Sequence, residues 1–498
     1  MDRLGYDRVM RLRVALLAAE CEPWAKTGGL ADVVDSLARA LGRLPGSGAD
    51  LAAPVDVLLP RYRIVNVPDD AVAEPPLRVP DPRGTGAVDA RLIDVAADGY
   101  RLRLVDVPEA FDRDGLYDHP DDPWRFAVFC RVALAALKRD GSPLDVLHVH
   151  DWHAGPALLE RARGEAAGDP FYRRLAVLLT LHNLAYHGWV PLEKLGQLGL
   201  RHGEELAGSN PFGLDLLLAA IERCDLANTV SPGFAREALT PAFGMGLDGA
   251  LLAKGDRFFG ILNGIDRASW DPASDAATAA PYSGDDLAGK AVCRSDLLDR
   301  LGFDPHDPGP VVGAIGRMDP QKGFDLLADA APGLLAAGVR IVVQGRGHDE
   351  LAAPFRALAA AHPDRVALVD RFDRSMARRI YAGADLFAMP SRFEPCGLGQ
   401  MIALRYGTPP VVRRTGGLAD TVIDADEAPG LGTGFLFEEA TPEALAAAVI
   451  RAARLRTGDP AAWAALQRRA MAQDFGWDTG SAPRYLEAYR RAVGIRRA

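Results

Sequence analysis

Short apolar runs alternate with amphipathic helical patterns along the whole chain. Many of these runs are apolar on both faces, which is typical of strands in a sheet covered by helices. The predicted strands are Val14–Ala19, Val55–Leu59, Val146–His150, Ala176–Thr180 and Leu226–Val230, followed by Val311–Ile315, Arg340–Gln344, Val366–Val369, Leu386–Met389 and Pro410–Val412. Predicted helices lie between them, as at Leu30–Leu41, Phe324–Leu335 and Leu398–Tyr406. The alternation predicts an α/β fold with parallel sheets and right-handed crossovers.

Ten predicted strands are too many for one sheet of ordinary size, so we expect at least two domains. The chain has 498 residues, enough for several domains of ~100–200 residues each. We expect the boundary near Asn263–Asp266, because the first set of strand–helix units ends there and a polar stretch follows at Asp271–Gly284. The segment Pro75–Val107 alternates like strands between Gly and Pro residues, which predicts a β-insertion in the first domain.

Composition and charge narrow the possible partners. Hydrophobic residues make up 48% of the chain and charged residues 25%, and the net charge is −10. An acidic chain lacks the broad basic surface that nucleic acid or anionic lipid requires, so we expect neither partner. No apolar run reaches the ~18 residues of a membrane-spanning helix, and we expect no targeting segment. The five cysteines form no CxxC pair, which favours reduced thiols and a cytoplasmic location.

One sequence pattern occurs twice. Lys26–Val34 reads KTGGLADVV, and Arg414–Val422 reads RTGGLADTV. Each copy follows a predicted strand and begins a predicted helix. The Gly-Gly turn lets the backbone approach a ligand, and the helix N-terminus offers free N–H groups to an anion. A single copy would indicate only a tight turn, but two copies in the two halves of the chain favour anion binding.

A pair of cations follows the first predicted strand of the second half. The motif Gly316–Phe324 places Arg317 and Lys322 beyond the end of a parallel strand, where ligands of open α/β sheets bind. The planar fork of Arg and the point charge of Lys can together grip a diphosphate without a metal.

A carboxylate and a cysteine follow a later strand, within Pro390–Gln400. The carboxylate of Glu394 can accept hydrogen bonds from sugar hydroxyls, or it is an ordinary acid at the start of a helix. Cys396 has no base nearby in the sequence, so a small buried apolar role is favoured over that of a nucleophile.

Histidines gather at the ends of two strands in the first half. His148 and His150 point to one face of their strand and precede Asp151, so a metal site is conceivable. Because no HExxH spacing supports it, a polar pocket in which Asp151 faces a substrate is favoured. His182 and Asn183 end another strand, where both can donate to and accept from hydroxyls. The chain has no P-loop, GxSxG elbow or GxGxxG loop, which removes support for kinase, hydrolase and dehydrogenase functions.

Taken together, the motifs resemble the bacterial and plant glycogen and starch synthases that use ADP-glucose. The motifs that carry the resemblance are Lys26–Val34, His148–Gly155, His182–Gly188, Leu262–Asp266, Gly316–Gly323, Ser391–Gln400 and Arg413–Val422. The resemblance implies a GT-B architecture, with two Rossmann-like domains facing a deep cleft. It also implies that residues 1–264 form the N-terminal, acceptor-side domain, that 265–475 form the nucleotide-sugar-binding domain, and that 476–498 form a helix crossing back to the first domain.

The resemblance further implies roles for individual residues. Lys26 matches a lysine that binds ADP-glucose, and Arg317 and Lys322 match a pair that neutralises the diphosphate. The implied catalytic residues are Arg317, Lys322, Glu394, Asp151 and His182. The implied substrate-binding residues are Lys26, Gly28, Gly29, Asp32, Tyr117, Asn183, Asn263, Cys396, Gly397, Leu398, Thr415, Gly416 and Gly417. The resemblance implies no metal ligand and no cofactor.

The implied reaction transfers glucose from ADP-glucose to the non-reducing end of an α-1,4-glucan, with retention of configuration and release of ADP. No carboxylate is plainly placed as a covalent nucleophile, so front-face attack is favoured over double displacement. The chain departs from the family pattern at Gly399, at Leu217–Ala220 and at Leu195–Leu214. These departures affect the expected handling of the acceptor glucan more than that of the donor ADP-glucose. Two alternatives remain: a related retaining glycosyltransferase with another nucleotide sugar or a small acceptor, and a non-catalytic glucan-binding protein.

Overall fold

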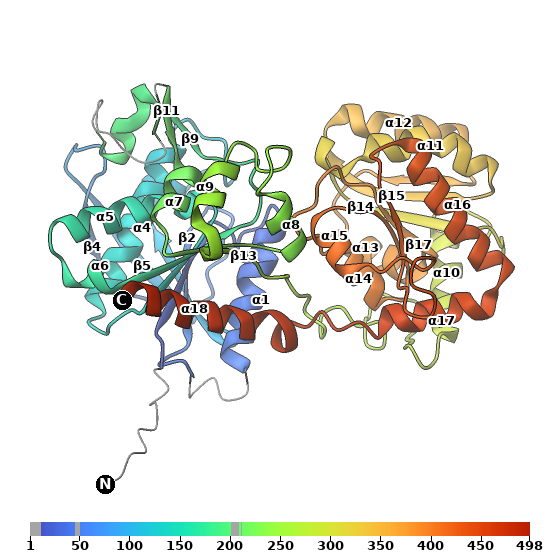
Figure 1. Cartoon of the computed structure of the whole chain (residues 1–498), viewed down its shortest axis with the longest axis horizontal. Helices are drawn as coiled ribbons and strands as arrows, with labels where there is room; N and C mark the ends of the chain where they lie inside the picture. Colours follow the sequence, from blue (N-terminus) through green and yellow to red (C-terminus); the bar gives the residue numbers. More distant parts are fainter. Residues whose placement is uncertain (1–10, 45–49, 201–208, 211) are drawn as a thin grey trace, which may run out of the picture. The chain divides into compact units, whose positions relative to one another are not determined.

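The computed structural model describes residues 11–44, 50–200, 209–210 and 212–498. The chain divides into two compact units (Figure 1). Unit 1 comprises the chain up to Val230, Ala235–Gly264 and Trp477–Ala498, and unit 2 comprises Ser231–Phe234 and Ile265–Gly476. Within the described ranges, every helix is too short or too polar to span a bilayer.

Unit 1 is built on a ten-stranded sheet. The strand order is β13-β12-β8-β7-β1-β2-β6-β5-β3, with β4 paired to β5. The strands are β1 (Val14–Leu17), β2 (Val55–Pro60), β3 (Val72–Ala73), β4 (Leu77–Pro80), β5 (Ala87–Ala97), β6 (Tyr100–Asp106), β7 (Val146–His150), β8 (Ala176–Leu181), β12 (Leu226–Thr229) and β13 (Phe258–Gly260). The pairs from β13 to β6 are parallel, whereas β5 runs antiparallel to its neighbours. This confirms the predicted parallel arrangement in the first half of the chain.

The strands predicted within Pro75–Val107 are confirmed in unit 1, but they belong to its main sheet and do not form an insertion. The segment contains β4, β5 and β6, but β6 pairs in parallel with β2, from Val55 opposite Tyr100 to Pro60 opposite Val105. Strand β6 is almost entirely buried, whereas buried and exposed residues alternate along much of β5. The alternation of β5 therefore marks the antiparallel edge of the main sheet.

Helices of unit 1 connect these strands. They are α1 (Gly29–Arg43), α3 (Pro108–Phe111), α4 (Asp122–Arg139), α5 (Pro156–Ala166), α6 (Pro170–Arg174), α7 (Leu216–Arg223), α9 (Asp248–Lys254) and α18 (Ala482–Arg497), and α8 (Pro232–Glu237) begins in unit 2. The last helix, α18, contacts β7 and β8 and buries Tyr485 and Tyr489. A small sheet of β10 (Ser209–Asn210), β11 (Gly213–Asp215) and β9 (Trp189–Pro191) completes the unit.

Unit 2 is built on a six-stranded parallel sheet with the order β16-β15-β14-β17-β18-β19. The strands are β14 (Val311–Met318), β15 (Arg340–Gly347), β16 (Val366–Val369), β17 (Leu386–Met389), β18 (Pro410–Arg413) and β19 (Phe435–Phe437). The helices are α10 (Ala288–Arg300), α11 (Phe324–Ala336), α12 (Asp349–Ala361), α13 (Arg374–Gly383), α14 (Gly399–Arg405), α15 (Gly416–Thr421), α16 (Pro442–Gly458) and α17 (Pro460–Met471). Apolar residues of the strands and of α11, α12 and α16 form one buried core.

Both parallel sheets reverse their strand order beside the first strand. In unit 1, β1 lies between β2 and β7, and in unit 2, β14 lies between β15 and β17. Ligands of open α/β sheets bind outside the carboxyl ends of the strands at such a reversal. The topology therefore directs attention to the loops after β1 and β7 in unit 1 and after β14 and β17 in unit 2.

The two Thr-Gly-Gly turns differ in how closely other backbone approaches them. A Cβ atom on Gly417 would lie 2.3 Å from the carbonyl oxygen of Cys396, and one on Gly416, where φ is +46°, would lie 2.1 Å from that of Glu394. A Cβ atom on Gly28 or Gly29 would have no neighbour within 4 Å. Only the second turn therefore requires glycine for packing in the structure.

We expect Gly417→Ala to lower the free energy of unfolding by about 1–3 kcal/mol, because the methyl group would push the Cys396 backbone away. The matched change Gly29→Ala, in the other copy of the motif, should stay within about 0.5 kcal/mol of the wild type. Urea denaturation of the ligand-free variants, followed by circular dichroism, measures both values. Equal stability of the two variants would contradict the close approach at Gly417.

Candidate active site

In unit 1, a buried carboxylate organises the loop after β1. Glu20 accepts hydrogen bonds from the Thr27 amide at 2.5 Å, the Thr27 hydroxyl at 2.7 Å and the Gly28 amide at 3.0 Å. It also accepts a hydrogen bond from the hydroxyl of Tyr117 at 2.7 Å. Glu20 thus joins Tyr117 to the Thr-Gly-Gly turn, and it already occupies backbone N–H groups that the sequence offered to a ligand anion.

Lys26 lies on the exposed side of the same turn. Its Nζ atom is 2.6 Å from Asp32 and 3.2 Å from Glu22. All three side chains are partly exposed to solvent, and such ion pairs contribute at most about 1 kcal/mol to stability. The ammonium group of Lys26 can therefore exchange these carboxylates for an anionic ligand at small cost.

Asp151 lies directly after β7, where φ is +54°, outside the regions that most residues adopt. Its carboxylate is buried and accepts a hydrogen bond from the His182 amide at 2.7 Å. Burial raises the pKa of Asp151 to about 7, although backbone hydrogen bonds from His182 and Asn183 oppose the shift. A strained, buried acid with such a pKa is typical of a functional site.

The neighbouring histidines are neutral and bonded to each other or to hydroxyls. His150 Nδ1 lies 2.9 Å from His182 Nε2, and burial lowers the pKa of His182 to about 3. His148 lies 2.9 Å from the hydroxyl of Tyr489 on α18 and 2.7 Å from that of Thr180. Both ring nitrogens of His148 are therefore engaged, so it fixes α18 to the sheet. Across the described residues, no three or more His, Cys, Asp or Glu side chains form a group able to hold a metal ion.

Two asparagines of the predicted site lie in loops of unit 1. Asn183 uses its Oδ1 atom to accept a hydrogen bond from the Ala185 amide at 3.0 Å, which shapes the loop after β8. Asn263 follows β13 and is 4% exposed. Its buried Oδ1 atom has no hydrogen-bond partner among the described residues. An unsatisfied buried acceptor costs stability, and in a native protein it often marks a functional position.

In unit 2, the loops after β14 and β17 bring a cation and a carboxylate together. Lys322 Nζ lies 2.6 Å from Glu394 Oε2, which also accepts a hydrogen bond from the Ser391 hydroxyl at 3.0 Å. Arg317, near the end of β14, lies 3.3 Å from Asp319, and its side chain is 51% exposed. The Asp319 carboxylate accepts a hydrogen bond from the Lys322 amide at 3.3 Å, which fixes the turn between the two cations.

The rest of the predicted unit 2 set packs where the loop after β17 meets α15. The Gly417 amide donates a hydrogen bond to the Glu394 carbonyl at 3.0 Å. Gln400 Nε2 donates to the carbonyls of Cys396 and Gly397, both at 3.0 Å. The other members of this set are Leu398, Thr415 and Gly416. Cys396 is buried and forms no disulfide.

The predicted residues of each unit thus lie in loops or helix starts after the strands of its sheet, and Lys26, Asp151, Arg317, Lys322 and Glu394 follow or end the strands beside the two reversals. Sequence analysis missed Glu20 and gave no individual role to Ser391 and Gln400, and all three residues hold the loops in place. Glu20 follows the end of β1 closely and is 4% exposed. Its position after an apolar strand was the available signal, because a charged residue there is rarely buried without a purpose.

Comparison with known proteins agrees with this arrangement. Residues 13–253 match the family model described as starch synthase catalytic domain, and residues 309–454 match that described as glycosyl transferases group 1. The chain is 41% identical to a glycogen synthase of Syntrophotalea carbinolica, covering 98% of this chain and 100% of that protein. It is 42% identical to a glycogen synthase of Thioalkalivibrio sulfidiphilus, covering 97% and 100%.

Solved structures give the same result. The catalytic domain of starch synthase IV from Arabidopsis thaliana, bound to ADP and acarbose, matches with a TM-score of 0.88 and 32% identity, covering 97% of this chain and 100% of that one. Sucrose-phosphate synthase from Thermosynechococcus elongatus shares the fold, with a TM-score of 0.60 and 20% identity over 97% of this chain and 100% of that one. The chain therefore belongs to the glycogen and starch synthase family of glycosyltransferases and has their GT-B fold.

Proposed function

We propose that the chain is a glycogen synthase that transfers glucose from ADP-glucose to the non-reducing end of an α-1,4-glucan. The observation that carries this proposal is the group of Arg317, Lys322 and Glu394 at the strand-order reversal of unit 2. The similar starch synthase is described as bound to ADP and acarbose, which supports a nucleoside diphosphate leaving group and an oligosaccharide acceptor.

In the proposed reaction, the two cations stabilise the departing ADP. Breaking the bond between glucose and the diphosphate builds negative charge on the leaving phosphate, and preorganised cations lower that barrier. The side chain of Arg317 is 51% exposed and pairs with Asp319, whereas Lys322 is held by Glu394. Glu394 keeps lone pairs beyond those used by Lys322 and Ser391, and these can accept hydrogen bonds from hydroxyls of the donor glucose.

Unit 1 supplies the polar groups proposed to act on the sugar. Asp151 and His182 are the proposed catalytic residues there, and Lys26, Tyr117 and Asn183 are proposed to bind substrate. We favour front-face attack, in which the acceptor hydroxyl enters on the face that ADP leaves.

The reaction is proposed to need no metal and no cofactor, because the two cations Arg317 and Lys322 neutralise the diphosphate. A cytoplasmic location belongs to the proposal, and the free cysteines of the described chain fit a reducing compartment.

The direct test measures ADP or UDP release by the purified protein from ADP-glucose or UDP-glucose, with and without glycogen. We expect ADP release that depends on glycogen and continues in EDTA, because the proposed charge stabilisation uses Arg317 and Lys322. Activity lost in EDTA and restored by magnesium or manganese would overturn the metal-free mechanism. A preference for UDP-glucose or for a small acceptor would favour a related glycosyltransferase. Glucan binding without turnover would favour a non-catalytic glucan-binding protein.

The variants Lys322→Gln and Arg317→Gln should each lower kcat by about 10²–10³-fold, because each removes a charge that stabilises the leaving diphosphate. Arg356→Gln is the matched control, since Arg356 forms ion pairs with Asp349 and Asp370 on α12 and the loop after β16. Loss of Lys322 leaves the buried Glu394 without its cation and can destabilise the fold. Melting curves therefore check that the variants fold. Near-normal turnover of a folded Arg317→Gln variant would refute the assigned role.

The raised pKa of Asp151 predicts a pH-dependent stability. The folded pKa is about 7 and the unfolded value is about 3.9, so the folded state binds more protons between these values. The Asp151 contribution to stability therefore falls as pH rises from about 4 to 7, by up to about 1.4 kcal/mol per pH unit. Asp151→Asn keeps an acceptor for the His182 amide but does not ionise.

We therefore expect Asp151→Asn to lose activity and to gain stability relative to the wild type as pH rises from about 5 to 7. Melting temperatures of the ligand-free proteins at three pH values measure the difference. Asp70→Asn, at an exposed aspartate of unit 1, is the control and should show no such trend. A constant stability difference between Asp151→Asn and wild type would show that Asp151 is ionised throughout.

A further inference from the structure

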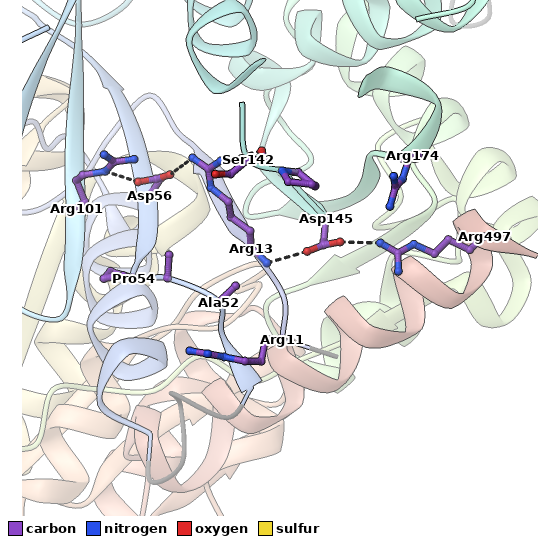
Figure 2. Close-up of a pocket in the computed structure, with 12 residues that line it drawn as sticks. Arg11, Arg13, Ala52, Pro54, Asp56, Arg101, Ser142, Asp145, Arg174 and Arg497 are labelled. Carbon is purple, nitrogen blue, oxygen red and sulfur yellow. Dashed lines mark hydrogen bonds and ion pairs between the residues drawn. The ribbon is translucent and has the colours of Figure 1, made fainter. Parts of the chain in front are cut away.

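A cavity of about 650 Å³ opens in unit 1 at the amino-terminal edge of its parallel sheet (Figure 2). Its lining comes from the residues just before β1, β2 and β7, from the first residues of β2 and β6, and from the ends of α6 and α18. The candidate active-site residues of unit 1 lie beyond the carboxyl ends of the same strands. A strand such as β7, with five residues, spans about 17 Å, so the cavity and the candidate active site are on opposite edges of the sheet.

The inner wall of the cavity holds two arginines whose charges are balanced within the protein. Arg13 lies 2.7 Å from Asp140 and 3.5 Å from Asp56, and Arg101 lies 2.6 Å from Asp56. Asp56 is 2% exposed. A buried carboxylate needs charged or hydrogen-bonding partners. The presence of Arg13 and Arg101 in the wall is therefore explained by their ion pairs with Asp56 and Asp140.

The outer wall holds three further arginines and one carboxylate. Arg497, near the end of α18, lies 2.6 Å from Asp145, whose second oxygen accepts a hydrogen bond from the Arg13 amide at 2.9 Å. Arg11 donates a hydrogen bond to the Leu51 carbonyl at 3.1 Å. Among the described residues, Arg11 and Arg174 have no carboxylate partner. Figure 2 shows Arg174 and Arg497 on the same side of Asp145, with Arg11 below it.

The outer wall therefore carries an excess of positive charge in a chain whose net charge is −10. Clustered guanidinium groups repel one another, and their planar forks match the oxygens of phosphoryl groups. We propose that this cavity binds a small polyanion with two or more linked phosphoryl groups, held by Arg11, Arg174 and Arg497. The volume suits a small molecule, and the acidic surface elsewhere disfavours nucleic acid.

Such a ligand would connect three segments that are distant in the sequence. Arg11 precedes β1, Arg174 ends α6, and Arg497 belongs to the last turn of α18. The same helix α18 is fixed to β7 through Tyr489 and His148. A bound polyphosphate would therefore stabilise the docking of α18 on unit 1, independently of catalysis at the opposite edge of the sheet.

The test is a calorimetric titration of the purified protein with inorganic tripolyphosphate at low ionic strength. We expect two classes of binding, one at the proposed diphosphate site of unit 2 and one at this cavity, and the class at the cavity should weaken at least tenfold in the double variant Arg174→Gln/Arg497→Gln. Arg491→Gln is the matched control, because Arg491 lies on the same helix but pairs with Asp256. Lys322→Gln should weaken the class at the diphosphate site and leave the affinity at the cavity unchanged, which separates this cavity from the proposed diphosphate site of unit 2.

A parallel titration with ATP distinguishes the possible sources of the phosphoryl groups. Tighter binding of ATP than of tripolyphosphate, in the class that the Arg174→Gln/Arg497→Gln variant weakens, identifies a nucleotide as the ligand of the cavity. Equal or weaker binding of ATP in that class identifies a polyphosphate without a base. Absence of tripolyphosphate binding to the wild type would overturn the proposal. Equal affinity of the wild type and the double variant would overturn it as well, because the anion would then bind elsewhere.

Discussion

The reversal of strand order beside the first strand of each sheet constrains everything else in this chain. It occurs between β1 and β7 in unit 1 and between β14 and β17 in unit 2. Loops that follow adjacent parallel strands on either side of a reversal turn away from each other, so polar side chains on those loops can face a ligand. Lys26 and Asp151 follow the strands at the first reversal, and Arg317, Lys322 and Glu394 follow or end those at the second. The arginine cavity, by contrast, lies at the amino-terminal edge of the unit 1 sheet.

At each reversal a buried glutamate holds the loops in place. Glu20 is bound by two amides and two hydroxyls, whereas Glu394 is bound by Lys322 and the Ser391 hydroxyl. A buried carboxylate is stable only with such partners, so each acid fixes the geometry of the turn around it. The two acids differ in their partners: Glu20 uses uncharged donors and leaves Lys26 on the exposed side, whereas Glu394 pairs with the cation Lys322.

Apolar runs predicted most of the architecture, because strands buried on both faces have a strong sequence signal. The fold class and the family were confirmed, and strands such as Val146–His150 and Leu386–Met389 match the structure residue for residue. Short strands such as β13 and β19 were missed, since three residues carry too little pattern. Strand β6 was assigned to an insertion because the sequence pattern indicates a strand but not its partner. The partner, β2, is distant in the sequence. The candidate site residues remain predictions.

The repeated Thr-Gly-Gly pattern shows why a motif cannot be interpreted without its neighbours. In unit 1 the Thr27 and Gly28 amides bind the carboxylate of Glu20, and in unit 2 the Gly417 amide binds the Glu394 carbonyl. These three N–H groups are therefore satisfied within the chain, and binding of an anion by both turns stays a prediction. Within unit 2, the side chains of Arg317 and Lys322 are the groups proposed to meet the charge of a diphosphate. The glycines serve a different purpose in the second copy, where they let the Glu394–Cys396 backbone approach α15 and so place Glu394 beside Lys322.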